Sequence, residues 1–174
     1  MIVRPFSGTL YRIHSPRWAH QPTSGAGAAQ HGGRANRPGV EALYLATDVE
    51  TALAEFQQAS PILAPGTIVS YGISLERIAD FSGGFDAAHW HPIWEDFFCD
   101  WRKLALHNIE PPSWVASDKA LAEGMQGILF PSAARNGGVN LVVYTGQVGP
   151  NDALTVIDPN GDLPKDQSSW KNVI

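Results

Sequence analysis

The sequence predicts a single domain of the α+β class. Short apolar, β-branched segments and helical patterns both occur, but they do not alternate regularly as they do in βαβ folds. No internal repeat or low-complexity tract interrupts the 174 residues, so we expect one domain over 1–174. A chain of this length buries roughly 70% of its unfolded surface, so its core needs no disulfide.

About six segments are predicted to be strands, because they are short, apolar and bounded by turn residues. In the second of them, ALYLA, Leu43 and Leu45 alternate with Tyr44, so Tyr44 points to the face opposite both leucines. The predicted strands are residues 9–13, 42–46, 67–75, 127–130, 141–144 and 154–157.

About three helices are predicted. The pattern TDVE at 47–50 is typical of a capping box at a helix start, and Pro61 ends that helix. An aromatic-rich helix is expected over 93–106, and a third over 114–123, closed by Gly124. Residues 149–169 are rich in Pro, Asn, Asp, Gly and Ser and predict a surface turn region that leads into the C-terminal tail.

Composition excludes several classes of partner. The net charge is −5 and no block of Lys or Arg occurs, which argues against nucleic acid as the main partner. The sequence has no secretion signal and no apolar run of membrane-spanning length, so we expect neither export nor a membrane span. The single cysteine, Cys99, fits a reducing compartment, and we expect a cytoplasmic protein.

Residues 22–39 form a loop rich in Gly and Ala, which we expect to be mobile. It contains His31–Gly32–Gly33 and then Arg34, whose guanidinium could donate two hydrogen bonds to a phosphate. The loop fits neither a Walker motif nor a dinucleotide fingerprint. A flexible surface loop with an incidental arginine is the alternative interpretation.

Three further residues are candidates on local grounds. Glu55 lies roughly 110° from an apolar helix face centred on Val49, Leu53 and Phe56, so it sits at the rim of that face. It could be a functional carboxylate or a solvated one. Tyr44 could stack on a ligand ring or be a half-exposed strand residue. Ser132 follows a strand and could orient a ligand or form a turn; no GxSxG surrounds it.

The histidines and aromatic residues give weaker signals. His89–Trp90–His91 is the only tight histidine pair and lacks a second ligand pair, and no HExxH occurs, so we expect no metal site. The aromatic residues at 90–101 have mixed helical spacing, which favours a core-facing helix over a ligand box.

The order of these segments resembles the RES-domain family. The matching segments are LYRI at 10–13, the Gly-rich loop at 22–39, ALYLATDVETALAE at 42–55 and GILFPSAAR at 127–135. The family is named for an arginine, a glutamate and a serine, which by position would be Arg34, Glu55 and Ser132. Tyr44 and Arg12 match the tyrosine of YLA and the arginine of LYR. The family often has an aromatic residue directly after GGR, where this chain has Ala35.

The resemblance implies a bacterial toxin paired with an Xre-like antitoxin. The implied fold is similar to ADP-ribosyltransferases, with two small mixed sheets around a cleft for NAD, which is the substrate. The implied activity is NAD breakdown or transfer of ADP-ribose to a cellular protein, with no metal.

The resemblance also implies roles for the site residues. Cleavage of the nicotinamide–ribose bond passes through an oxocarbenium-like transition state, which a single carboxylate, Glu55, could stabilise. Arg34 or Arg12 would hold the pyrophosphate, with Gly33 letting the backbone approach. Tyr44 would stack on nicotinamide, and Ser132 would orient by hydrogen bonding.

Two other functions compete with this one. A non-enzymatic module could bind a protein partner through the Gly-rich loop and the Trp-rich helix, without NAD turnover. An RNA-cleaving toxin is disfavoured by the acidic composition and by the lack of a cluster of histidine and basic residues.

Overall fold

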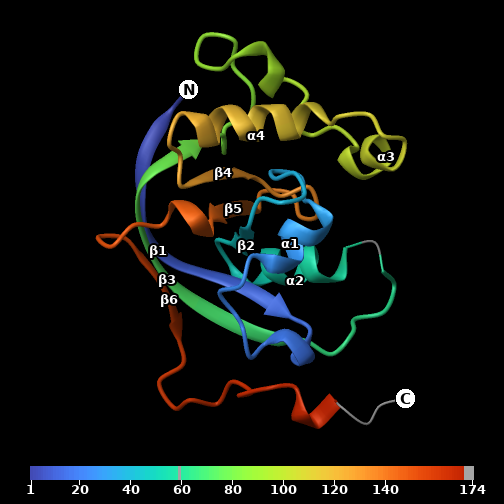
Figure 1. Cartoon of the computed structure of the whole chain (residues 1–174), viewed down its shortest axis with the longest axis vertical. Coiled ribbons are helices and arrows are strands. Elements are labelled where there is room, and N and C mark those ends of the chain that lie inside the picture. Colours follow the sequence, from blue (N-terminus) through green and yellow to red (C-terminus); the bar gives the residue numbers. More distant parts are fainter. Residues whose placement is uncertain (59, 171–174) are drawn as a thin grey trace.

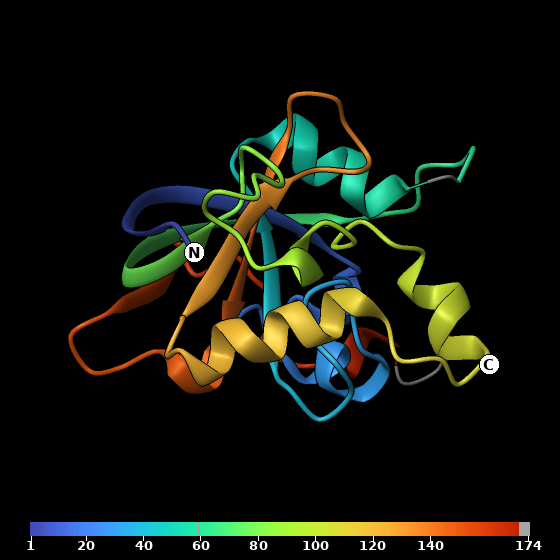
Figure 2. The same cartoon turned by 90° about the horizontal axis from the view of Figure 1, so that it is seen from above.

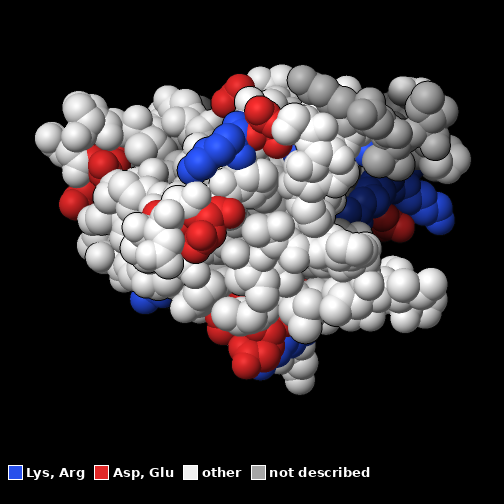
Figure 3. Space-filling view, turned by 90° about the horizontal axis from the view of Figure 1, so that it is seen from below, with Lys and Arg blue, Asp and Glu red and all other residues white. Residues whose placement is uncertain are grey.

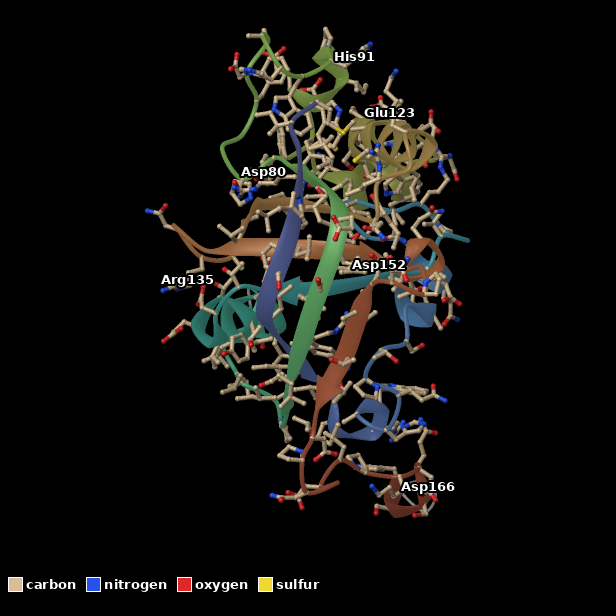
Figure 4. The ribbon with its side chains drawn as sticks, turned by 90° about the vertical axis from the view of Figure 1, so that its left-hand side faces the viewer. Asp80, His91, Glu123, Arg135, Asp152 and Asp166 are labelled. Carbon is tan, nitrogen blue, oxygen red and sulfur yellow. The ribbon has the colours of Figure 1, made fainter. Side chains whose placement is uncertain are left out.

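Two long strands organise the fold. In the computed structural model, which describes residues 1–58 and 60–170, β1 (Val3–His14) pairs antiparallel with β3 (Thr67–Asp80) over nearly its whole length. The two strands run side by side across one side of the molecule (Figure 4). Both are longer than predicted, because their ends pair with each other beyond the apolar core segments.

The strands form one sheet that closes on itself. The order is β1-β2-β5-β4-β3, β3 pairs back to β1, and β6 is added outside β3. One pair of residues, Tyr11 and Ala46, joins β1 to β2. All pairs are antiparallel except β3 with β4. The remaining strands are β2 (Ala42–Ala46), β4 (Gly127–Pro131), β5 (Val139–Tyr144) and β6 (Ala153–Ile157).

The α+β class is confirmed, but the expected two small sheets are wrong. The long strand β3 has β1 along one edge and, along the other, β6 beside Ser70–Ser74 and β4 beside Ile78–Asp80. One strand therefore joins what the sequence suggested were separate sheets, and the result is barrel-like.

The described residues contain four α-helices (Figure 1). Seen from above, α4 and α2 lie well apart (Figure 2). Both pack against the same face of β2, with Ala116 and Ala120 of α4 in one cluster with Ala42 and with Ala52 of α2 beside Ala46. The helices are α1 (Ala26–His31), α2 (Val49–Gln57), α3 (Trp101–Leu106) and α4 (Pro112–Ala122). Short 3-10 turns occur at Pro16–Trp18, Pro92–Trp94, Thr145–Gln147 and Ser168–Trp170.

The long aromatic helix predicted over 93–106 is wrong. Only the 3-10 turn Pro92–Trp94 and the short α3 are helical, and turns connect them. Asp100 ends the irregular stretch by capping α3 through a bond from Lys103 N. The aromatic residues nevertheless form core, because Trp90, Trp94 and Phe97 are buried around Phe81.

The helix α2 also begins differently from the prediction. Asp48, rather than Thr47, is its N-cap: one carboxylate oxygen accepts from Thr51 N and the other from Thr51 Oγ1, each at 2.8 Å. Asp48 further pairs with Arg135 at 3.4 Å, and Figure 4 shows Arg135 beside α2. This contact ties the helix to the turn after β4.

Two apolar layers follow from the strand alternation. Leu43 and Leu45 point into the barrel with leucine, isoleucine and valine residues of the other four strands of the barrel. Ala42 and Tyr44 point outward, toward a second core beneath α4 and the aromatic turns. The predicted direction of Tyr44 is therefore confirmed, and the outer face of β2 and β5 carries the candidate site.

Candidate active site

One large pocket lies on the outer face of β2 and β5. Its volume is about 910 Å³, at the upper end of the range for small-molecule sites. Arg12, Gly33, Arg34, Tyr44 and Glu55 line it. The structure thus brings together five of the six predicted site residues around one space, and Ser132 lies directly behind Glu55.

Glu55 reaches this pocket because α2 is rotated relative to the prediction. Val49 and Leu53, which we expected at the centre of the apolar face, are both 37% exposed. The residues buried against the sheet are instead Thr51 and Ala52. Glu55 follows them by four and three positions and so shares their face. Small residues let the helix lie close to the sheet and bring the carboxylate to the pocket wall.

Two donors fix the carboxylate of Glu55. Its Oε1 accepts from Ser132 Oγ at 2.7 Å and from Asn140 Nδ2 at 2.6 Å. Within the described residues no hydrogen bond reaches Oε2. One oxygen is therefore anchored while the other remains available to a ligand.

Ser132 forms the turn that was one interpretation of its sequence context, and it also contacts Glu55. Its Oγ accepts from the backbone N–H groups of Ala134 and Arg135, each at 3.1 Å, so it forms a turn after β4. Because those bonds fix the oxygen, its own proton is directed at Glu55. Ser132 therefore positions the carboxylate rather than lining the pocket.

The Gly-rich loop is held in place, contrary to the expected mobility. It contains the short helix α1, and the Asn36 side chain donates to the carbonyls of Ala28, Arg37 and Val40. Trp114 Nε1, on α4, donates to Gly33 O at 2.7 Å. Buried hydrogen bonds thus fix this loop together with the apolar packing of Ala35, Ala28 and Val40.

Tyr44, on β2, forms hydrogen bonds to the Gly-rich loop. Its hydroxyl donates to Asn36 Oδ1 at 2.7 Å and accepts from Ala35 N at 2.9 Å. A Cβ on Gly33 would lie 2.3 Å from the Tyr44 hydroxyl, so only glycine fits there. Desolvation raises the pKa of Tyr44 above its ordinary value, so the phenol stays neutral. Ala35 itself is fully buried, which explains the small side chain at this position.

Arg34 is oriented by the turn before α3. Its Nη1 donates to Phe97 O at 3.1 Å and to Cys99 O at 3.0 Å. Its guanidinium lies 5.3 Å from the centre of the Phe98 ring. Desolvation lowers the pKa of Arg34 below its ordinary value, as does, to a lesser degree, the positive charge of Arg102, but an arginine remains charged.

The charge of the pocket is positive. Three arginines, Arg12, Arg34 and Arg102, line it against one carboxylate, Glu55. None of these arginines forms a salt bridge with another described residue. In Figure 3 a hollow on one side of the molecule holds blue and red side chains close together. A protein of net charge −5 therefore concentrates unpaired positive charge in one pocket, which favours an anionic ligand.

Comparison with known proteins shows the family of this chain. A model of the RES domain matches residues 9–166. The chain belongs to the RES-domain family. Among solved structures, this RES-domain chain is similar to the MbcT chain of the M. tuberculosis MbcT–MbcA toxin–antitoxin complex. The identity is 25% and the TM-score 0.60, over 90% of this chain and 86% of that chain. No curated protein matches the chain.

The three residues that were matched by position to the arginine, glutamate and serine of the RES-domain family lie together at this pocket. Arg34 and Glu55 line it, and Ser132 donates to Glu55. They come from the loop after α1, from α2 and from the end of β4, so only the folded chain assembles them.

Several residues of the RES-domain pocket could not be found from sequence patterns. Asn140 lies within the apolar strand VNLVVY, where a lone polar residue at an outward position was the only signal. Asn36 and Trp114 fix the loop from positions that no motif marks. Arg102 and Trp101 enter the pocket from α3, in the segment that was predicted as one long core helix.

Neither a metal cluster nor a membrane helix is found in the part of the chain that the structure describes. No group of three or more His, Cys, Asp or Glu side chains there is arranged to bind a metal ion. No helix there has the length and apolar character needed to cross a membrane.

Proposed function

We propose that this chain is the toxin of a toxin–antitoxin pair and that it cleaves the nicotinamide–ribose bond of NAD. The observation that carries the proposal is the anchored carboxylate of Glu55 in a pocket lined by three arginines without acidic partners. A pocket with one carboxylate and several cations suits a substrate that has a diphosphate and a bond that breaks with positive charge on the sugar.

Glu55 is the residue we assign to the reaction centre. When the nicotinamide bond breaks, positive charge develops on the ribose ring, and a fixed carboxylate stabilises it. Nicotinamide leaves as a neutral molecule from a cationic ring, so no general acid is needed. Oε2 of Glu55 is the atom that would face the ribose, because Ser132 and Asn140 hold Oε1.

The other residues act in binding and positioning. Arg34 presents its remaining N–H groups to the diphosphate while Nη1 stays on the backbone carbonyls of Phe97 and Cys99. The Tyr44 ring offers a surface for nicotinamide, and Arg12, which donates to Tyr44 O at 3.3 Å, holds that strand. Gly33 lets the loop backbone approach the ligand.

The acceptor of ADP-ribose is water, phosphate or a protein side chain. Arginine-directed ADP-ribosyltransferases carry Glu or Gln two residues before the catalytic glutamate, and this chain has Leu53 there. Leu53 is partly exposed and packs away from the buried face of α2. We therefore expect no transfer to arginine side chains.

An antitoxin partner is part of the proposal. The structurally similar MbcT occurs in a complex with MbcA, described as a toxin–antitoxin complex. An Xre-like protein that covers the pocket would protect the producing cell from loss of NAD. Growth of cells that express the chain, with and without the partner, measures this protection.

The decisive experiment follows nicotinamide release from NAD by the purified chain. Loss of the Glu55 charge in Glu55→Gln should lower the rate on the order of 10²- to 10³-fold, while the thermal midpoint stays the same. Glu50→Gln is the matched control, since Glu50 is exposed on the first turn of the same helix. A wild-type chain that releases no nicotinamide, alone or with cell lysate, contradicts the proposed function.

A further inference from the structure

Arg102 differs from the other two arginines of the pocket. Arg12 donates to the carbonyl of Tyr44 and lies deep among the strands, and Arg34 donates to two carbonyls at once. Arg102 is exposed on α3, and within the described residues its one side-chain hydrogen bond is to Gln58 Oε1, at 3.5 Å. A neutral amide at the limit of hydrogen-bonding distance holds a guanidinium only weakly.

The contact between Arg102 and Gln58 spans the pocket. Gln58 is the residue directly after α2, the helix that carries Glu55, whereas Arg102 belongs to α3. Both residues line the pocket. Figure 1 shows α2 and α3 as separate helices on the same side of the molecule. The two side chains therefore bridge the walls of the pocket at its exposed margin.

The Trp101 ring fixes the direction in which Arg102 extends. The guanidinium carbon lies 4.8 Å from the centre of that ring, within the range of a cation–π interaction. Trp101 also lines the pocket. A guanidinium stacked on an aromatic face keeps its N–H groups free at the edge, in the plane where a phosphate oxygen would approach.

The charges of the pocket also favour an anion between Arg34 and Arg102. Arg102 lies close enough to lower the pKa of Arg34, so the two cations repel one another. An anion with two phosphate groups would relieve this repulsion. A phosphate oxygen is also a stronger acceptor for a guanidinium than the amide of Gln58.

We propose that Arg102 is a second phosphate-binding residue, which exchanges Gln58 for one phosphate of a diphosphate ester while Arg34 holds the other. The inference rests on the proposed function in naming NAD as the physiological ligand. It adds a specificity-determining residue: the pair of arginines selects a diphosphate, such as that of ADP-ribose, over a monophosphate.

The test measures the binding of ADP-ribose, which contains the diphosphate but no bond to nicotinamide, so that no turnover disturbs the measurement. Arg102→Gln should raise the Kd for ADP-ribose about tenfold, the loss expected for one charge-assisted contact at an exposed site. Lys103→Gln is the matched control, because it removes the same charge from the next, exposed position of α3, outside the pocket lining. It should change the Kd less than twofold. Arg102→Lys should restore part of the affinity.

Kinetics with NAD provide the second measurement. Because Arg102 is assigned to a phosphate and not to the breaking bond, Arg102→Gln should raise KM and leave kcat nearly unchanged. An unchanged Kd for ADP-ribose in Arg102→Gln, or an equal loss in Lys103→Gln, overturns the assignment of Arg102.

The two proposals fail separately. If the wild-type chain releases no nicotinamide but Arg102→Gln still weakens ADP-ribose binding, the NAD-cleaving function is wrong and the phosphate site stands. If NAD is cleaved and ADP-ribose binding does not depend on Arg102, only the phosphate site is wrong. A wild-type chain that binds no ADP-ribose contradicts the phosphate site whatever its activity.

Discussion

The position of Glu55 depends on two neighbours rather than on its own helix. Ser132 and Asn140 both donate to Oε1, from the ends of different strands. A carboxylate that stabilises a developing charge must be held in one orientation, because a small rotation moves the free oxygen away from the ribose.

We therefore predict that Asn140→Ala lowers kcat for NAD about tenfold or more and changes KM little. The lost bond is one to a charged group, which contributes about 1.5–3 kcal/mol. Asn136→Ala is the control, since Asn136 is exposed in the adjoining turn. Steady-state kinetics of both variants measure kcat and KM for NAD. A rise in KM with kcat unchanged would mean that Asn140 binds the substrate directly.

At the scale of single elements, the loop before β2 depends on one glycine. A Cβ at position 33 would lie 2.3 Å from the Tyr44 hydroxyl and 2.6 Å from Asn36 Oδ1, two atoms that hydrogen-bond each other. Neither side chain is free to move, because the Tyr44 hydroxyl accepts from Ala35 N and the Asn36 amide nitrogen donates to Ala28 O.

Gly33→Ala should accordingly lower the free energy of unfolding by about 1–3 kcal/mol, the usual effect of overpacking. Gly27→Ala is the control from the same segment: a Cβ there meets nothing within 4 Å, and alanine favours the helix α1. Chemical denaturation of the two variants measures the difference. Equal stability of both would show that the loop rearranges at no cost.

The elements also show where sequence reasoning succeeds and fails. The strands were predictable, because alternation and bounding turns are local properties. The aromatic segment was misassigned, since the carbonyls of Phe97 and Cys99 bond to Arg34, which is more than sixty residues away in the sequence. The orientation of α2 was misjudged because Thr51 and Ala52 are weakly apolar but small enough for close packing against the sheet.

In the candidate site, too, some residues could be predicted from the sequence and others could not. Arg34, Glu55 and Ser132 could be named from the order of the matching segments, while Asn140 and Arg102 could not. Their roles follow only from strand register and from the position of α3, since Asn140 pairs with Phe130 on one side and Ala46 on the other. Apart from the lone polar position of Asn140 in an apolar strand, the neighbouring residues of the sequence do not indicate either placement.

At the scale of the whole molecule, the barrel contains a buried histidine that links its interior to the loop after β1. His14 Nε2 lies 2.6 Å from the Tyr71 hydroxyl, and that hydroxyl donates to Pro22 O at 2.8 Å. The hydroxyl proton is thus used, so the neutral imidazole donates through Nε2. Burial, with the neighbouring charge of Arg12, lowers the pKa of His14 to about 4.

This pKa predicts acid sensitivity of the fold. The unfolded chain takes up a proton on His14 near pH 6.5 and the folded chain near pH 4. The contribution of His14 is therefore fully present above pH 6.5 and is lost as the pH falls from 6.5 to 4, by up to about 3 kcal/mol.

Urea unfolding between pH 7.5 and 4 measures this loss, and His14→Gln should flatten the dependence on pH because glutamine keeps a donor but does not titrate. The dependence of the free energy of unfolding on pH that remains in that variant comes from the titration of carboxylates. The same slope in both proteins would show that His14 makes no contribution.

The hydrogen bonds that fix the Gly-rich loop have a consequence for how the proposed activity is controlled. Trp114, Tyr44 and Asn36 hold that loop through hydrogen bonds within the chain itself, so we expect the pocket wall to keep its shape without help from a substrate. Binding then involves no ordering step, and its observed rate should rise linearly with ligand concentration. We therefore expect the proposed toxic activity to be controlled by another molecule rather than by a rearrangement of this loop.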